Sequence, residues 1–197
     1  MNLNDPRARR TRSSLKGALL ELANEEQLSD ITISKVAKRA DVNRATVYLH
    51  YPDLDSLLID AMEDAVAEVV RTASLCPLDG RGDSAPEQLV TLFTHISRHA
   101  TLYARALGPH GSAPFAVRMR EKLAAALLER FEVGARPSGF ETVPAEVHAA
   151  YLAGALLGVI AQWITSEAPD SPEDIGRATW QLLRVRGGAA DGPPRRR

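Results

Sequence analysis

One short segment carries four polar side chains at alternate positions: Arg44, Thr46, Tyr48 and His50. The guanidinium offers five hydrogen-bond donors in a planar fork, and the hydroxyl, phenol and imidazole add further donors and acceptors. Such a set suits recognition of phosphates and of base edges. Val47 can pack inward, but a helix with so few apolar anchors is poorly held unless its other face serves a partner. The alternative is a tight three-helix subdomain whose polar face meets only solvent.

Two short helices joined by a tight turn are expected to position these side chains. Thr32 can cap a helix over 33–40 and Asn43 can cap a second over 44–50, because their side-chain oxygens can accept from unpaired first-turn amides. The intervening residues 40–42 have the length of a turn that joins two helices at a steep angle. This pairing predicts a helix-turn-helix, in which one helix braces against DNA and the next enters the major groove.

The run Ile31–Pro52, followed by Leu57 and Leu58, resembles the DNA-binding domain of TetR-type repressors. The elements Thr-x-x-x-Val/Ile-Ala and Val-x-x-x-Thr-x-Tyr-x-His-Tyr/Phe match in order and spacing, and the likeness extends from Arg10 to Met62. The resemblance implies that 44–50 is the recognition helix. The residues it implies for DNA binding are Thr32, Ser34, Lys35, Arg44, Ala45, Thr46, Tyr48 and His50.

Roles for these residues follow as expectations. Arg44 is the candidate base reader, because its forked donors match guanine O6 and N7. Thr46 is expected at a thymine methyl or a phosphate, whereas Tyr48 and His50 occupy positions that hold the DNA backbone in similar proteins. Thr32, Ser34 and Lys35 are expected at phosphates, and Tyr51 is expected in the core.

Two positions depart from the family pattern. The turn commonly has glycine where this chain has Asp41, which adopts a left-handed conformation less readily. The start of the next helix commonly has lysine where this chain has Leu54, flanked by Asp53 and Asp55. A usual phosphate contact is therefore missing, and the basic stretch 7–16 is a candidate replacement.

The charge distribution agrees with a DNA-binding N-terminal part. The chain has a net charge of −1, yet residues 1–52 hold nine Lys or Arg against six acidic residues. Where positive charge sits matters more for nucleic-acid binding than the total. Cys76 is the only cysteine, so no disulfide can form within the chain, and no secretory signal opens it. We expect a cytoplasmic protein.

Helical periodicity dominates the rest of the chain, so the expected fold is all-α. An N-terminal helix-turn-helix domain (1–52) is expected to join, through one long helix that begins at Asp53, a helical ligand-binding and dimerisation domain (53–186). A disordered tail is expected over 187–197. Ser84–Glu87 reads as a capping box that opens a further long helix reaching Leu107.

For the second domain, the resemblance implies a symmetric homodimer and a small-molecule effector. Helices near 145–166 and 172–186 are the expected dimer contacts. Aromatic and polar groups on inward helical faces suggest a site for a small apolar or aromatic effector, with ordinary core packing as the alternative. The candidate ligand-binding residues are Phe93, His99, Tyr103, Met119, Gln162 and Trp163.

Other classes of function are less well supported. Gly80–Ala85 imitates a dinucleotide fingerprint but follows no strand, so we expect no enzyme and no cofactor. His95 and His99 are spaced to chelate a metal but lack a third ligand, so no metal is expected. The uncharged stretch 149–166 suits a closely packed helix better than a membrane span, because of its length and its many small residues.

The expected function is a repressor that a small molecule releases from a palindromic double-stranded DNA operator. Two alternatives stay open, a dimeric regulator controlled without a ligand and a helical interaction module.

Overall fold

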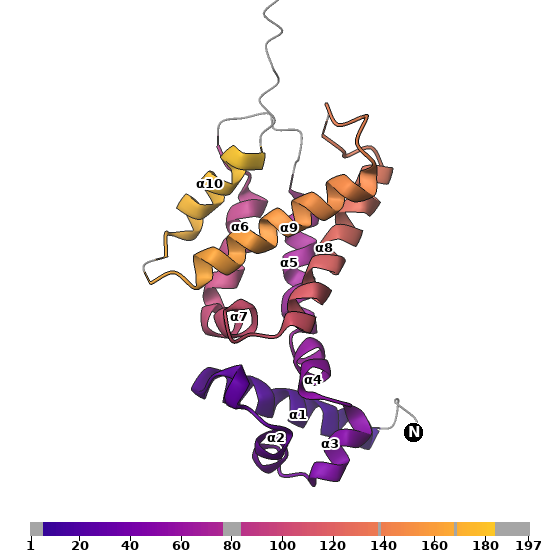
Figure 1. The fold of residues 1–197 in the computed structure, drawn as a ribbon, viewed down its shortest axis with the longest axis vertical. Helices are drawn as coiled ribbons and strands as arrows, with labels where there is room; N and C mark the ends of the chain where they lie inside the picture. The colour runs from indigo at the N-terminus through magenta and orange to yellow at the C-terminus, as the bar shows by residue number, and fades with distance from the viewer. Residues whose placement is uncertain (1–5, 77–83, 138, 168, 184–197) are drawn as a thin grey trace, which may run out of the picture.

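The computed structural model describes residues 6–76, 84–137, 139–167 and 169–183, and every regular element in these ranges is a helix (Figure 1). The all-α prediction is confirmed. The predicted tail over 187–197 and the Gly80–Asp83 part of the glycine-rich loop lie outside these ranges. The elements are α1 (Pro6–Glu25), the 3₁₀ helix η1 (Leu28–Asp30), α2 (Ile33–Arg39), α3 (Arg44–His50), α4 (Leu54–Ala61), α5 (Glu63–Leu75), α6 (Glu87–Arg98), α7 (Ala100–Leu107), α8 (Ala113–Glu132), α9 (Ala145–Ile164) and α10 (Pro172–Leu183).

Helix α1 is the packing centre of the N-terminal part. Its apolar residues recur at helical spacing, so Leu15, Leu19 and Leu22 lie on one face and are buried. That face packs against α2 and α4. Helices α2 and α3 add Val36 and Val47, both fully buried, to the same core. Helix α2 is therefore held by α1, whereas α3 packs on α2 and is linked to α1 through Tyr51 at its C-terminal end.

A polar cluster of Arg12, Tyr51 and Asp60 ties α1, the end of α3 and α4 together. The Tyr51 hydroxyl donates to the Asp60 carboxylate, and Arg12 Nη2 donates to the same oxygen over 2.9 Å. Arg12 Nε also donates to the Tyr51 hydroxyl over 3.2 Å, and Lys16 Nζ lies 3.7 Å from the other Asp60 oxygen. Burial and the bond to Asp60 raise the pKa of Tyr51 to about 12. Tyr51 is 3% exposed, as predicted for a core residue.

The larger C-terminal part consists of α5–α10 (Figure 1). Helices α8 and α9 pack along each other, α10 packs on α6, and α5 lies against both α6 and α8. Phe93 and Trp163 meet edge to face with ring centroids 5.3 Å apart. Helix α9 is the one helix in the described ranges that is long and apolar enough to cross a membrane. Its buried face, which includes Ala153 and Ile160, belongs to the core of this part.

Two predicted long helices are broken in the structure. The helix expected from Asp53 onward is interrupted at Met62 (φ −95°, ψ 5°), and the one expected to reach Leu107 is interrupted at His99 (φ −118°, ψ 28°). Neither break has a proline or glycine. Each lets the two halves of a helix meet different partners: α4 packs on α1 while α5 packs on α6 and α8, and α6 packs on α10 while α7 packs on α1 and α9.

The predicted capping box over Ser84–Glu87 is also wrong. Helix α6 begins at Glu87 with Pro86 at its N-cap, and no side chain caps it. Ser84 therefore lies too far before the helix to bond its first amides. Helix α8 does have a side-chain cap, because the Ser112 hydroxyl accepts from the Phe115 amide over 3.1 Å.

Polar bonds at two places join the N-terminal and C-terminal parts, beside the packing of α7 on α1 and of α8 on α4. Arg105 on α7 donates through Nη1 to the carbonyls of Ala23 and Glu26, at the end of α1. The last carbonyls of a helix have no partner within it, so a guanidinium there satisfies them and meets the negative end of the helix dipole. Ser112, before α8, donates to Asp55 on α4 over 2.5 Å. The orientation of the N-terminal part is therefore set by specific polar bonds.

Replacing Asp60 with asparagine is expected to destabilise the protein by about 1–2 kcal/mol, because Tyr51 and Arg12 lose a charged acceptor at a partly exposed site. Burial alone would raise the pKa of Asp60, but hydrogen bonds from Tyr51 and Arg12 outweigh it and hold that pKa below 3.8. The stabilisation is therefore present above the unfolded-state pKa and is lost as the pH falls through the folded-state pKa.

Urea denaturation of wild type and Asp60→Asn at pH 6 and at lower pH checks this expectation. The difference in unfolding free energy should be full at pH 6 and should shrink below about pH 4. A difference of the same size at both pH values would show that the charge on Asp60 contributes nothing.

Candidate nucleic-acid interface

Side-chain caps and one left-handed residue shape the α2–turn–α3 unit. The Thr32 hydroxyl accepts from the Lys35 amide over 3.3 Å, and Asn43 Oδ1 accepts from the Ala45 amide over 2.8 Å. Both predicted caps are confirmed. Asp41 has φ 53° and is the one residue other than glycine with a positive φ in the described chain. Aspartate tolerates this conformation better than most residues, so the turn forms without the usual glycine.

Helix α3 turns one continuous stripe toward solvent. Val47 is fully buried, and Thr46 and His50 are partly buried at the sides. The residues of the exposed stripe are Arg44, Ala45, Tyr48 and Leu49. Their spacing of one, three and one residues places them on a single helical face.

Leu49 belongs to this stripe although the motif spacing does not mark it as a DNA-binding residue. It is 69% exposed, and large apolar side chains that are this exposed gather at binding surfaces. Its exposure could have been inferred from the sequence, because Leu49 lies on the side of the helix opposite Val47, the residue that packs into the core. In a base-reading helix an apolar side chain can contact a thymine methyl group.

Arg44 and Tyr48 contact each other on this stripe. Arg44 Nη2 donates to the Tyr48 hydroxyl over 3.1 Å, and the guanidinium carbon lies 5.5 Å from the centre of the phenol ring. Arg44 forms no ion pair with a carboxylate in the described chain.

Helix α2 contributes the neighbouring surface. Thr32, Ser34 and Lys35 are all exposed. Lys35 is already engaged, because its Nζ lies 2.6 Å from Glu26 Oε2 and donates to the Asp30 carbonyl over 2.9 Å. Lys38 is exposed and forms no ion pair within the part of the chain that the structure describes. It is therefore a freer cation than Lys35.

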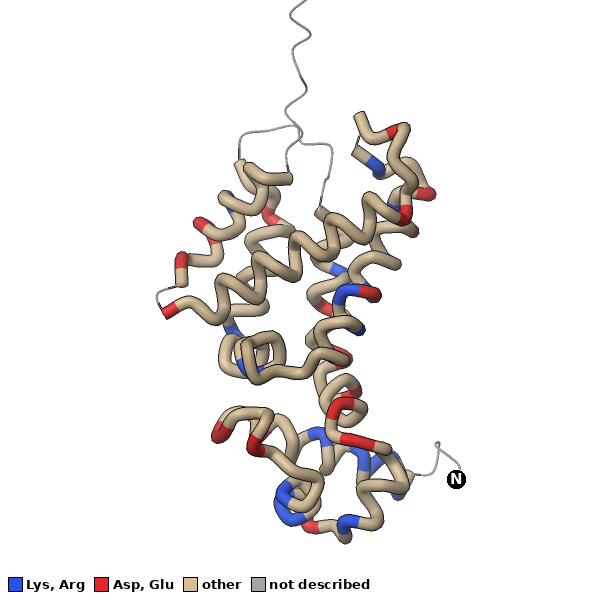
Figure 2. The backbone as a smooth tube through the Cα atoms, viewed as in Figure 1, with Lys and Arg blue, Asp and Glu red and all other residues tan. Residues whose placement is uncertain are grey.

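Several other basic residues of the N-terminal part are likewise paired with acids. Figure 2 shows that this part carries both basic and acidic positions along its backbone. Arg39 contacts Glu25 over 2.6 Å and Glu21 over 3.3 Å. Arg12 and Lys16 both pair with Asp60. The basic stretch 7–16 is part of α1, which begins at Pro6, so much of this stretch supports the fold rather than forming a flexible arm.

His50 closes α3 in an unusual environment. Its Nδ1 atom is buried and has no hydrogen-bond partner in the described chain. Burial, followed by the nearby positive charge of Arg12, lowers the pKa of His50 below 6.5. The imidazole is therefore neutral at pH 7.

The acidic residues at the start of α4 have structural roles. Asp53 Oδ1 accepts from the Ser56 amide over 2.7 Å and caps the helix, which lowers the pKa of Asp53. Asp55 accepts from Ser112, and Leu54 packs against the core. The position where the family pattern has lysine is therefore used for packing.

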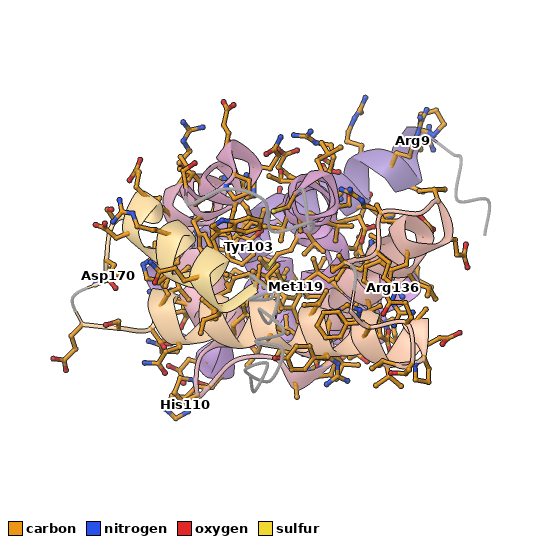
Figure 3. The ribbon with its side chains drawn as sticks, turned by 90° about the horizontal axis from the view of Figure 1, so that it is seen from above. Arg9, Tyr103, His110, Met119, Arg136 and Asp170 are labelled. Atoms are coloured by element: carbon orange, nitrogen blue, oxygen red, sulfur yellow. The ribbon has the colours of Figure 1, made fainter. Side chains whose placement is uncertain are left out.

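The six candidate ligand-binding residues fall into three groups. Phe93, Tyr103 and Met119 are fully buried, and Figure 3 shows Tyr103 and Met119 among the helices of the C-terminal part. His99 is exposed at the break between α6 and α7. Gln162 and Trp163 line a groove of about 500 Å³ between α9 and α10. The structure does not bring the six into one open site, and their shared role stays a prediction.

The remaining cavities are smaller or lie elsewhere. An apolar cavity of about 30 Å³ lies among Cys76, Leu89, Leu127 and Leu156. This volume holds about one water molecule. No group of three or more histidine, cysteine or acidic side chains in the described ranges is arranged to hold a metal ion. His95 and His99 are close, with ring centroids 5.1 Å apart, but no third ligand joins them.

Comparison with known proteins extends the likeness over most of the chain. Residues 83–184 match the family described as the transcriptional regulator C-terminal region of the TetR class. A curated HTH-type transcriptional regulator of Bacillus subtilis (strain 168), YxbF, is 24% identical over 87% of this chain, and the match covers 44% of YxbF. The chain therefore spans less than half of that relative's length.

Solved structures share the whole architecture. A TetR transcriptional regulator from Streptococcus agalactiae 2603V is 21% identical, with a TM-score of 0.67 over 93% of this chain and 98% of that chain. RolR in complex with resorcinol is 21% identical, with a TM-score of 0.58 over 90% of this chain and 89% of that chain. The family match covers about half of the chain, and the α2–turn–α3 unit supplies the DNA-binding element that the match does not include. This chain belongs to the TetR family of transcriptional regulators.

Proposed function

We propose that this regulator is a repressor that binds a palindromic DNA operator with α3 in the major groove. The observation that carries the proposal is the exposed stripe of α3, led by Arg44 at the N-terminal end of the helix, where no acid neutralises it. Recognition helices contact base edges mainly through their N-terminal residues. Arg44 is placed for that role, with its forked donors suited to guanine.

The proposed contacts around Arg44 follow from exposure. Ala45 and Leu49 offer apolar surface to thymine methyl groups, and Thr46 is at the side of the stripe. Thr32, Ser34 and Lys35 on the α2 side are proposed to contact phosphates, and Lys38 joins them as an unpaired cation. His50, being neutral at pH 7, contacts a phosphate as a hydrogen-bond donor rather than as a cation.

Substitutions of Arg44 and of Lys35 are expected to impair DNA binding in different ways. Arg44→Ala is expected to cost about 1–3 kcal/mol of discrimination at one base pair, because a bidentate contact to one base is lost. Lys35→Ala is expected to weaken binding to every sequence and to flatten the dependence of log affinity on log salt concentration, by less than the one unit expected for an unpaired lysine, because Lys35 is already paired with Glu26. The matched control is Arg118→Ala on α8, which is exposed and far from α3 along the chain.

The measurement has two steps. Selection from random double-stranded DNA identifies the operator, and titrations at several salt concentrations then compare it with its single-base variants. Recovery of a palindrome separates a regulator from a helical interaction module that does not read DNA. Equal losses for operator and random DNA in both variants would contradict the division into base reader and phosphate contact.

A homodimer through α9 and α10 is proposed as the functional form. The open face of these helices forms the groove of about 500 Å³ and is lined mainly by small or apolar side chains, including Ala155, Gly158, Ala178 and Leu182. Leu182 is 79% exposed and Tyr151, elsewhere on α9, is 69% exposed. A second copy would cover this surface, and two recognition helices about 34–36 Å apart would then read two operator halves. We propose a cytoplasmic location, with α9 facing protein rather than lipid.

Gly158→Leu is expected to break this dimer without unfolding the chain. A Cβ atom built at Gly158 meets no atom within 4 Å, so one chain accommodates a side chain there, whereas a partner packed into the groove cannot. Sedimentation velocity should show at least a 10-fold weaker dimer, which corresponds to about 1.4 kcal/mol, and operator affinity should fall with it. Gly17→Leu is the control, because Gly17 is also a helical glycine with open space around it. A Gly158→Leu protein that dimerises like wild type would place the interface elsewhere.

Release by a small apolar or aromatic effector is proposed, with the dimeric regulator controlled without a ligand as the second candidate. RolR, which has the same fold, was solved with resorcinol bound. Phe93, Tyr103, Met119 and Trp163 supply aromatic and apolar surface in the C-terminal part of this chain, but they are closely packed. An effector would have to bind an opened state of this core and thereby shift the population of the two states.

A further inference from the structure

The contact between Arg44 and Tyr48 links two residues that face solvent one helical turn apart on α3. The guanidinium donates to the phenol oxygen over 3.1 Å and lies near the ring, with its carbon 5.5 Å from the ring centre. Tyr48 is itself 47% exposed, so the contact forms at the surface and not in the core. The phenol engages the guanidinium both through its oxygen and through its π system.

This environment distinguishes Arg44 from the cations of the N-terminal part that form ion pairs. Arg12, Lys35 and Arg39 are held by carboxylates. An arginine held by a carboxylate must give up a charged partner before it can bind DNA. Tyr48 restrains Arg44 while leaving the positive charge on Arg44 uncompensated.

We propose that Tyr48 is a positioning residue that holds the guanidinium of Arg44 ready for base recognition. The inference rests on the proposed function, in which Arg44 reads a base. It assigns to Tyr48 a role in sequence discrimination, beyond the phosphate contact that its place in the motif implies. An arginine side chain has several rotatable bonds, and restraining it before DNA binds reduces the entropy lost on binding.

The chemistry of the pair permits both roles of Arg44. A guanidinium has five N–H donors, and the bond to Tyr48 uses one of them at Nη2. The second N–H of Nη2 stays free. Together with the N–H of the nitrogen beside it on the same edge of the guanidinium, Nε or Nη1, it can form the paired bonds to O6 and N7 of guanine. The Tyr48 hydroxyl accepts from Arg44 and keeps its own proton, which it can donate to a phosphate.

A double-mutant cycle tests the proposal. Tyr48→Phe removes the acceptor but keeps the ring, so discrimination at the base pair read by Arg44 should fall about 2- to 10-fold, the range for one hydrogen bond. Discrimination at the other base pairs should not change. In the Arg44→Ala background, Tyr48→Phe should have no further effect on discrimination, because the residue through which Tyr48 acts is absent.

Two further measurements sharpen the test. Arg44→Lys retains the positive charge without the planar fork and should discriminate like Arg44→Ala. In the free protein, the Arg44 guanidinium N–H signals in NMR spectra should change with Tyr48→Phe, while circular dichroism of the two proteins should agree. This readout requires no DNA and detects the pairing itself.

The outcomes separate the inference from the proposed function. Equal losses for all sequences on Tyr48→Phe, in both the wild-type and the Arg44→Ala backgrounds, would overturn the positioning role and leave Tyr48 as a phosphate contact. A wild-type protein that selects no DNA sequence would instead overturn the proposed function, and the positioning role with it.

Discussion

The recognition helix α3 is not stable on its own, and this constraint determines how the N-terminal part is built. Helix α3 has seven residues and one buried side chain, Val47. An isolated helix of this length is unstable in water, because nucleation costs more than so few hydrogen bonds return. Its conformation is therefore imposed by the Asn43 cap, by the turn at Asp41, by α2 on which it packs, and by the bonds of Tyr51 to α1 and α4. The residue types on the exposed stripe of α3 can therefore serve binding, because none of these residues is needed for packing.

The same constraint extends to the junction with the larger part. Helix α1 packs on α2 and α4 on one side, and its final carbonyls receive Arg105 from α7. Asp55 on α4 receives Ser112 from the segment before α8. Rearrangement of the C-terminal core would strain or release these bonds and so alter the placement of α1, on which α3 depends. The residues proposed to sense an effector and those proposed to read DNA are thus connected through a few polar contacts.

Local signals in the sequence predicted the elements that local chemistry forms. The caps at Thr32 and Asn43 and the turn at Asp41 each depend on a residue and its immediate neighbours, and each is present. The helix breaks at Met62 and His99 were not predictable in this way. Neither position carries a helix-breaking residue, and both breaks arise from the different partners that the two halves of each helix meet.

The interface was predictable to a similar degree. The recognition helix and its polar residues could be predicted from motif spacing. The exposure and the partners of each side chain could be learned only from the three-dimensional structure. Lys35 is paired with Glu26 nine residues earlier in the chain, and no periodicity reveals that pairing. The exposure of Leu49 and the contact of Arg44 with Tyr48 depend on which face α3 turns toward α1.

The ion pairs of the N-terminal part change what DNA would meet electrostatically. Of its nine basic residues, Arg12, Lys16, Lys35 and Arg39 already have carboxylate partners. When one of these basic side chains leaves its carboxylate and binds a DNA phosphate, the phosphate releases a bound cation. The freed carboxylate then attracts a cation from solution, which offsets that release. The number of ions released when this protein binds DNA should therefore be smaller than its basic residues suggest. Its affinity for nonspecific DNA would be correspondingly low. A larger share of the binding free energy would then come from the few groups that distinguish one sequence from another.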